Sequence, residues 1–171
     1  MNQYRPGSTK NLNNSNSGNF PLSTTQLNEV DISRCARQLK SFIIADDFIE
    51  GEVTKSQLYL EQLHSRGQHL FREVFLRVWV ELFSVDNPKH LYTFISVSSC
   101  IPYEWLKHHG DALILGCCSH DSTLVNESCI RLAESWENPQ HADQLEKMRE
   151  FQESWLESYR LQTINYLKGL N

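Results

Sequence analysis

Hydrophobic residues recur every three or four positions through most of the chain, and this pattern is clearest from Pro102 to Trp136. In the second half of this stretch, one helical face carries Val125, Cys129, Leu132, Ala133 and Trp136. In the first half, a second stripe carries Trp105, His109, Ala112, Leu113, Gly116 and Cys117. Pro102 suits the first position of a helix, and Asp121 or Ser122 suits the cap of the next one. The pattern predicts two consecutive helices, the first buried on more than one side.

The same spacing predicts helices over most of the remaining sequence. Their expected ranges are 31–48, 54–64, 68–84, 87–99 and 138–168. Asp31 is a candidate cap for the first of them, and residues 65–67 form either a turn or a kink. The strongest core candidate, 68–84, has a wide stripe of Leu70, Phe71, Val74, Phe75, Val78 and Leu82. A strand over 75–83 is the alternative, because β-branched and aromatic residues favour strands.

The last predicted helix carries both an apolar face and a possible binding surface. Its main stripe consists of Leu145, Met148, Gln152, Trp155, Tyr159, Gln162 and Tyr166. Phe151 lies off this stripe and is surrounded along the helix by Glu146, Glu150, Glu153 and Glu157. An exposed aromatic ring among carboxylates is typical of an interface with a basic protein. These five residues are the predicted protein-binding site, and packing of Phe151 on a neighbouring hairpin is the alternative.

Composition divides the chain into two parts. Residues 1–25 include the run NLNNSNSGN, which has almost nothing to bury, so we predict a disordered tail there. Residues 26–171 are expected to form a single all-helical domain, because this length can enclose one hydrophobic core.

The charge and the cysteine content indicate which class of partner and which cellular compartment to expect. The chain has 16 basic and 21 acidic residues, and its net charge of −5 argues against nucleic acid and suits a basic protein partner. No apolar run approaches the length of a membrane span, and the N-terminal segment lacks the apolar region of a signal peptide. We therefore expect a cytoplasmic protein that does not contact membranes and whose five cysteines are reduced.

Two turns of similar sequence point to a repeat. Asn87-Pro88 and Asn138-Pro139 each follow an amphipathic helix. The stretch DALILGCCSHDSTLVNESCIRLAESWENP resembles a HEAT-type repeat, in which an apolar helix and a short Asp-containing turn precede a second helix. The residues in the matching places are Asp121, Val125, Cys129, Leu132 and Ala133. The resemblance implies a curved stack of helix pairs that binds other macromolecules, usually proteins.

One dipeptide suggests a different chemistry. His120-Asp121 is the pair found in metal-dependent phosphohydrolases of the HD superfamily, where a divalent metal would activate a bound water. Further ligands would come from candidates such as His64, His69, His108 and Asp143. The local signals favour instead a turn between helices with Asp121 as the cap.

Two other groups only superficially resemble metal sites. Glu61 and His64 have the spacing of a di-iron helix, but no second Glu-x-x-His follows. Cys117 and Cys118 are adjacent on one helix, so their side chains point about 100° apart and rarely reach one zinc ion. We therefore predict no catalytic residue, no cofactor and no metal.

The expected architecture is all-α, with about six or seven helices. They form either stacked hairpins, as in a fragment of a HEAT-like α-solenoid, or a compact helical bundle. A small acidic helical chain without a catalytic set favours a non-enzymatic protein-binding module, such as an immunity or antitoxin-type inhibitor or a subunit of an effector complex. The alternative is a metal-dependent hydrolase of HD type built on His120 and Asp121.

Overall fold

The computed structural model describes residues 24–170, with side chains from Asn28 onward. All regular structure in this part of the chain is α-helical, which confirms the predicted fold class. Its helices are α1 (Thr24–Ala45), α2 (Lys55–Arg66), α3 (Gln68–Phe83), α4 (Pro88–Ser98), α5 (Tyr103–Leu106), α6 (His108–Cys118), α7 (Thr123–Ser135), α8 (Gln140–Glu146) and α9 (Ser154–Lys168). Among these residues, no helix combines the length and apolarity needed to cross a membrane.

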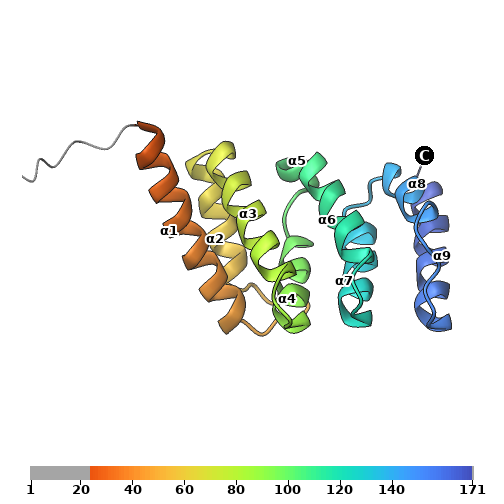
Figure 1. Cartoon of the computed structure of the whole chain (residues 1–171). Helices are drawn as coiled ribbons and strands as arrows, with labels where there is room; N and C mark the ends of the chain where they lie inside the picture. Colours follow the sequence, from red (N-terminus) through yellow and green to blue (C-terminus); the bar gives the residue numbers. More distant parts are fainter. Residues whose placement is uncertain (1–23, 171) are drawn as a thin grey trace, which may run out of the picture.

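The helices succeed one another along one direction, from α1 at one end of the molecule to α9 at the other (Figure 1). Neighbouring helices pack as hairpins, namely α2 with α3, α6 with α7 and α8 with α9. Between hairpins, α1 packs on α3, α4 packs on α7, and α7 packs on α9. This arrangement is compatible with both predicted architectures, stacked hairpins and a helical bundle. The HEAT assignment itself stays a prediction.

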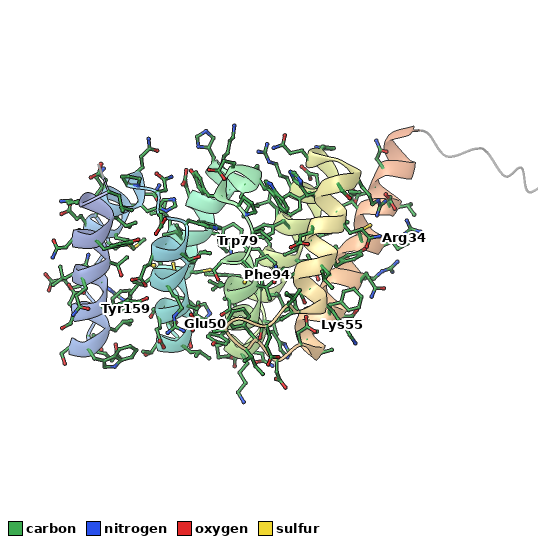
Figure 2. The ribbon with its side chains drawn as sticks, turned by 180° about the vertical axis from the view of Figure 1, so that it is seen from behind. Arg34, Glu50, Lys55, Trp79, Phe94 and Tyr159 are labelled. Carbon is green, nitrogen blue, oxygen red and sulfur yellow. The ribbon has the colours of Figure 1, made fainter. Side chains whose placement is uncertain are left out.

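The core is centred on α3, as its wide apolar stripe predicts. Phe71, Val74, Phe75, Val78 and Leu82 are all buried there. The rings of Phe75 and Phe94 lie 4.7 Å apart and join α3 to α4. Figure 2 shows Phe94 among the helices, whereas Arg34 projects from the outer side of α1. Residues 75–83 are therefore helical, and the strand alternative is wrong.

The first described helix begins earlier than predicted. It includes Asp31 in its interior instead of using it as a cap. The Asp31 carboxylate pairs with Arg34 in the next turn and with Arg66 at the end of α2. Hydrogen bonding by Arg34 lowers the pKa of this carboxyl group below its ordinary value. Asp31 thus links α1 to α2 through its ion pair with Arg66. The local sequence did not predict this contact.

The helix predicted after Pro102 is split in two. Lys107 has φ 51°, an uncommon value for a residue with a side chain, and it separates the short α5 from α6. The break lets the Trp105 ring stack on the ring of His64, with centroids 3.8 Å apart. As expected, α6 buries more than one side, with Leu113 and Ile114 both enclosed.

The helix predicted over 138–168 is also interrupted, so that prediction is wrong. Residues 147–153 are not helical and separate α8 from α9. The buried face of α9 consists of Leu156, Arg160, Thr163, Ile164 and Leu167. Leu145 and Met148 of the predicted stripe do contact the core, but its α9 part points away from the core, and Trp155 is 51% exposed. An arginine in the buried face explains why hydrophobic periodicity selected the wrong side.

Both Asn-Pro turns precede a helix, as predicted; Asn87 is the N-cap of α4, whereas Asn138 lies one residue before the N-cap of α8, Pro139. The Asn87 side-chain oxygen accepts the amide of Lys89, and the Asn138 oxygen accepts the amide of Gln140. The helices that follow pack differently, because α4 contacts α3 whereas α8 contacts α9. The two turns therefore share their local chemistry and differ in their tertiary setting.

Candidate functional site

A hollow lies between the α6–α7 turn and the segment that joins α8 to α9. It has a volume of about 560 Å³. Its lining residues are Leu115, Cys118, Ser119, His120, Asp121, Asn126, Lys147, Met148, Arg149 and Phe151. A smaller cavity of about 170 Å³ shares five of these and is also lined by Thr123, Glu150, Gln152 and Glu153. We call the two cavities together the cleft.

Asn126 holds the α6–α7 turn in place. This residue is buried in the first turns of α7, and its side-chain amide nitrogen donates to backbone carbonyls at the end of α6. The acceptors are the oxygens of Cys117 at 3.0 Å, Cys118 at 3.2 Å and His120 at 2.9 Å. The Cys117 oxygen also accepts the backbone N–H of His120 at 3.2 Å, and Asn126 adds a side-chain donor where the last carbonyls of α6 run out of partners within the helix.

His120 and Asp121 have different roles from those predicted. His120 Nδ1 accepts the backbone N–H of Ser122 at 2.9 Å, so in the neutral ring the proton sits on Nε2. The ring meets Phe83 edge-on with centroids 5.3 Å apart. Ser122 occupies the N-cap position of α7 but makes no side-chain capping bond, and Asp121 is exposed. The predicted capping bond by Asp121 or Ser122 is therefore wrong, and His120 and Asn126 order the turn instead.

The cleft combines an apolar floor with charges of both signs. Leu115, Met148 and Phe151 supply the apolar surface. Lys147 lines only the larger cavity, and Arg149 lines both. Three carboxylates, those of Asp121, Glu150 and Glu153, line the smaller cavity. Thr123 Oγ1 donates to Glu153 at 3.4 Å and links the two walls.

The structure places the five predicted protein-binding residues in different locations. Glu150, Phe151 and Glu153 meet in the cleft, although Phe151 is partly buried against the core, as the alternative expected. Glu146 pairs with Lys168 on the outer surface. Glu157 pairs with the buried Arg160 and faces the interior. The break after α8 brings the first three residues beside His120 and Asp121, which were predicted for a separate function.

The candidate metal ligands do not converge. Within the described residues, no group of three or more histidine, cysteine, aspartate or glutamate side chains is placed to hold a metal ion. His64 stacks on Trp105, and His108 is near Asp111. Exposed His69 approaches Glu73 on its own helix. The ligand set required for the HD-type alternative is thus not assembled around His120.

A buried polar network was missed by sequence reasoning. Tyr103 donates its hydroxyl to Asp111 at 2.9 Å, and His141 Nε2 lies 3.2 Å from the same carboxylate oxygen. His141 is fully buried, and burial lowers its pKa. These contacts link α8 to α5 and α6. The members of the network are separated along the chain, so no local motif marked it.

Replacing Asn126 with alanine should destabilise the fold by about 1–3 kcal/mol, because buried carbonyls at the end of α6 lose their donor. Asp121→Ala should change the free energy of unfolding by less than about 0.5 kcal/mol, since its exposed carboxylate caps nothing in the structure. Urea denaturation of both variants measures these values. An Asp121→Ala loss as large as that of Asn126→Ala would restore the original capping hypothesis.

Comparisons of the chain with protein-family models, with curated proteins and with solved structures found no match.

Proposed function

We propose that this chain is a non-enzymatic protein-binding module that holds a basic segment of a partner protein in the cleft. The observation that supports the proposal is that the two adjoining cavities of the cleft bring apolar side chains close to three carboxylates. Lysine and arginine side chains combine an apolar stem with a charged head, so they match such a surface. The stem would lie along Met148 and Phe151, and the head would reach the carboxylates of Glu150 and Glu153.

Charge supports a basic partner over an acidic one. The chain carries a net charge of −5, and the smaller cavity contains three carboxylates against the single guanidinium of Arg149. Long-range attraction would therefore accelerate association with a basic protein, and added salt would reduce this acceleration. Lys147 in the larger cavity, together with Arg149, would select a partner that also presents an acidic group or backbone carbonyls to the cleft.

An inhibitor of the immunity or antitoxin type, or a subunit of an effector complex, fits this proposal. Such proteins act by covering a partner, and they require a shaped and charged surface without a reactive group. The HD-type hydrolase finds no supporting ligand arrangement among the described residues.

The test uses two variants that change the charge equally at different places. Glu150→Lys with Glu153→Lys reverses two charges in the cleft, whereas Asp47→Lys with Glu52→Lys reverses two exposed charges in the loop between α1 and α2. Partners captured from a lysate of the source organism are identified with the wild-type chain, then purified for calorimetry. We expect the cleft variant to weaken binding at least about tenfold, or about 1.4 kcal/mol, and the loop variant to change it little.

Two further measurements make this test decisive. Circular dichroism must show both variants folded, and Glu150→Gln with Glu153→Gln provides a milder change if the lysines disturb the start of α9. The wild-type association rate should fall with added salt, and the cleft variant should show a smaller salt dependence. Equal affinities and equal salt dependence in the two charge-reversal variants would exclude the cleft as the docking surface.

A further inference from the structure

Cys118 and Cys129 face each other across the α6–α7 hairpin. Cys118 is the last residue of α6, and Cys129 lies in the middle of α7. Their sulfur atoms are 2.6 Å apart, whereas a covalent S–S bond measures about 2.05 Å. A disulfide between them requires the two sulfur atoms to approach by about half an ångström. We propose that Cys118 and Cys129 are a redox-active pair that forms a reversible disulfide beside the cleft.

A reagent in solution can reach one sulfur atom more easily than the other. This difference determines which cysteine attacks the reagent and which one resolves the mixed disulfide. Cys118 is 7% exposed and lines the larger cavity, so a small reagent can reach it. Cys129 is fully enclosed behind it. Lys147 and Arg149 line the same cavity and would attract an anionic reagent. Cys118 is therefore the attacking cysteine, and Cys129 is the resolving one.

The hydrogen bond made by Cys129 agrees with these roles. The Cys129 thiol donates to the backbone oxygen of Ile114 at 3.1 Å, so its single proton points away from Cys118. Burial raises the pKa of the Cys129 thiol well above its ordinary value, so Cys129 is not the cysteine that attacks first.

The reaction is thiol–disulfide exchange with a small-molecule disulfide. The Cys118 thiolate attacks one sulfur of that reagent, the reagent's S–S bond breaks, and a mixed disulfide and one thiolate result. Cys129 then attacks the Cys118 sulfur and releases the second half of the reagent as a thiolate. The two cysteine protons pass to these thiolates. The cysteine pair loses two electrons, and the reagent gains them as two thiols.

The neighbouring cysteine does not take part. Cys117 is fully buried and lies beside Trp79, on the side of α6 that faces α3. Burial raises the pKa of its thiol to about 12, so it is protonated and inaccessible. Cys100 is exposed and lines another cavity with Ser128 of α7, and Cys35 is buried in α1. Cys118–Cys129 is thus the disulfide that the geometry selects.

The experiment treats the purified full chain with oxidised glutathione, blocks remaining thiols and maps the disulfides by mass spectrometry. Cys118 and Cys129 share one tryptic peptide, because no lysine or arginine lies between them, and cleavage after Glu127 separates them. We expect the two fragments to stay linked until dithiothreitol is added. The oxidised chain should melt about 5–10 °C higher than the reduced chain.

Three variants test the assignment. Cys117→Ala should retain the link, Cys118→Ser should abolish it, and Cys129→Ala should leave glutathione attached to Cys118. A link that persists in Cys118→Ser would overturn the proposal in favour of Cys117. Glutathione that remains on wild-type Cys118, or modification confined to Cys100, would also overturn it. If Cys129→Ala does not fold, the wild-type map and Cys118→Ser decide the question. None of these results depends on the proposed protein partner.

Discussion

Val78→Asp is expected to unfold the protein. Val78 is completely buried in the middle of α3, among the aromatic and aliphatic side chains that join α3 to its neighbours. A carboxylate at this position has no cation or hydrogen-bond donor to replace water, so burying it costs several kcal/mol. The total stability of a domain of this size is about 5–15 kcal/mol. We expect loss of the cooperative thermal transition by circular dichroism and aggregation in size-exclusion chromatography.

Val80→Asp is a matched control on the same helix. Val80 is 57% exposed, and the substitution has the same chemistry. The exposed carboxylate stays hydrated, so the free energy of unfolding should change by no more than about 0.5 kcal/mol. A soluble Val78→Asp variant with an unchanged melting temperature would show that α3 is not part of the core.

Glu157→Gln is expected to be the second most damaging of the changes considered. Arg160 is only 4% exposed, and both its Nε and one terminal nitrogen donate to the Glu157 carboxylate, with Nε at 2.9 Å. Its other terminal nitrogen donates to the backbone oxygen of Leu145 in α8. Removing the carboxylate leaves a buried guanidinium without a counter-charge, which costs about 3–5 kcal/mol. Urea denaturation measures this loss.

Glu127→Gln is the control for an exposed pair. Glu127 pairs with Arg131 one turn along α7, and the arginine side chain is well exposed to solvent. Losing such a pair costs at most about 1 kcal/mol. Equal losses in the two glutamine variants would mean that the Arg160 guanidinium is hydrated in solution and that the buried pair does not hold α9 against α8.

The Glu157–Arg160 pair also predicts an acid sensitivity. Hydrogen bonding from Arg160 lowers the pKa of the Glu157 carboxyl below its ordinary value of 4.5. A lowered carboxyl pKa stabilises the folded chain fully above the unfolded value, and this contribution disappears as the pH falls through the folded value. The melting temperature should therefore fall less for Glu157→Gln than for the wild type between about pH 6 and about pH 3.

This pair also changes the interpretation of the predicted binding face. Reversing the charges of Glu150 and Glu157 together was the natural test of an acidic face on a continuous helix. In the folded chain, Glu157→Lys would place two cations together in the interior, so weaker binding would report unfolding. Glu150 and Glu153 are the residues whose charge can be reversed to test the cleft.

Local sequence was sufficient to predict the all-α class and most of the helices. The stripe of α3 and that of α7 match their buried residues closely, because each helix has a broad apolar face and a polar opposite side. The Asn87 cap and the turn at Asn138 were also predictable, since each depends on a side chain and an amide two residues away. These features depend on residues that are close together in the sequence, so they can be predicted without the tertiary structure.

Only the tertiary structure determined where helices are interrupted. The segment between α8 and α9 contains neither proline nor glycine, so its propensity predicts a continuous helix. In such a helix, the Phe151 amide would donate to the oxygen of Lys147, four residues earlier. It donates instead to the Glu157 carboxylate at 3.1 Å, while the ring packs against the core. Burial of Phe151 and the Glu157–Arg160 pair outweigh the lost helical hydrogen bonds.

The candidate sites follow from that interruption and from hairpin packing. Glu150 and Glu153 meet Asp121 only because the chain turns back after α8. Cys118 and Cys129 meet because α6 and α7 pack antiparallel. In each case, residues distant in sequence are brought together by the packing of whole helices. Their meeting depends on the burial of apolar faces between helices, and no pattern within a single helix encodes it.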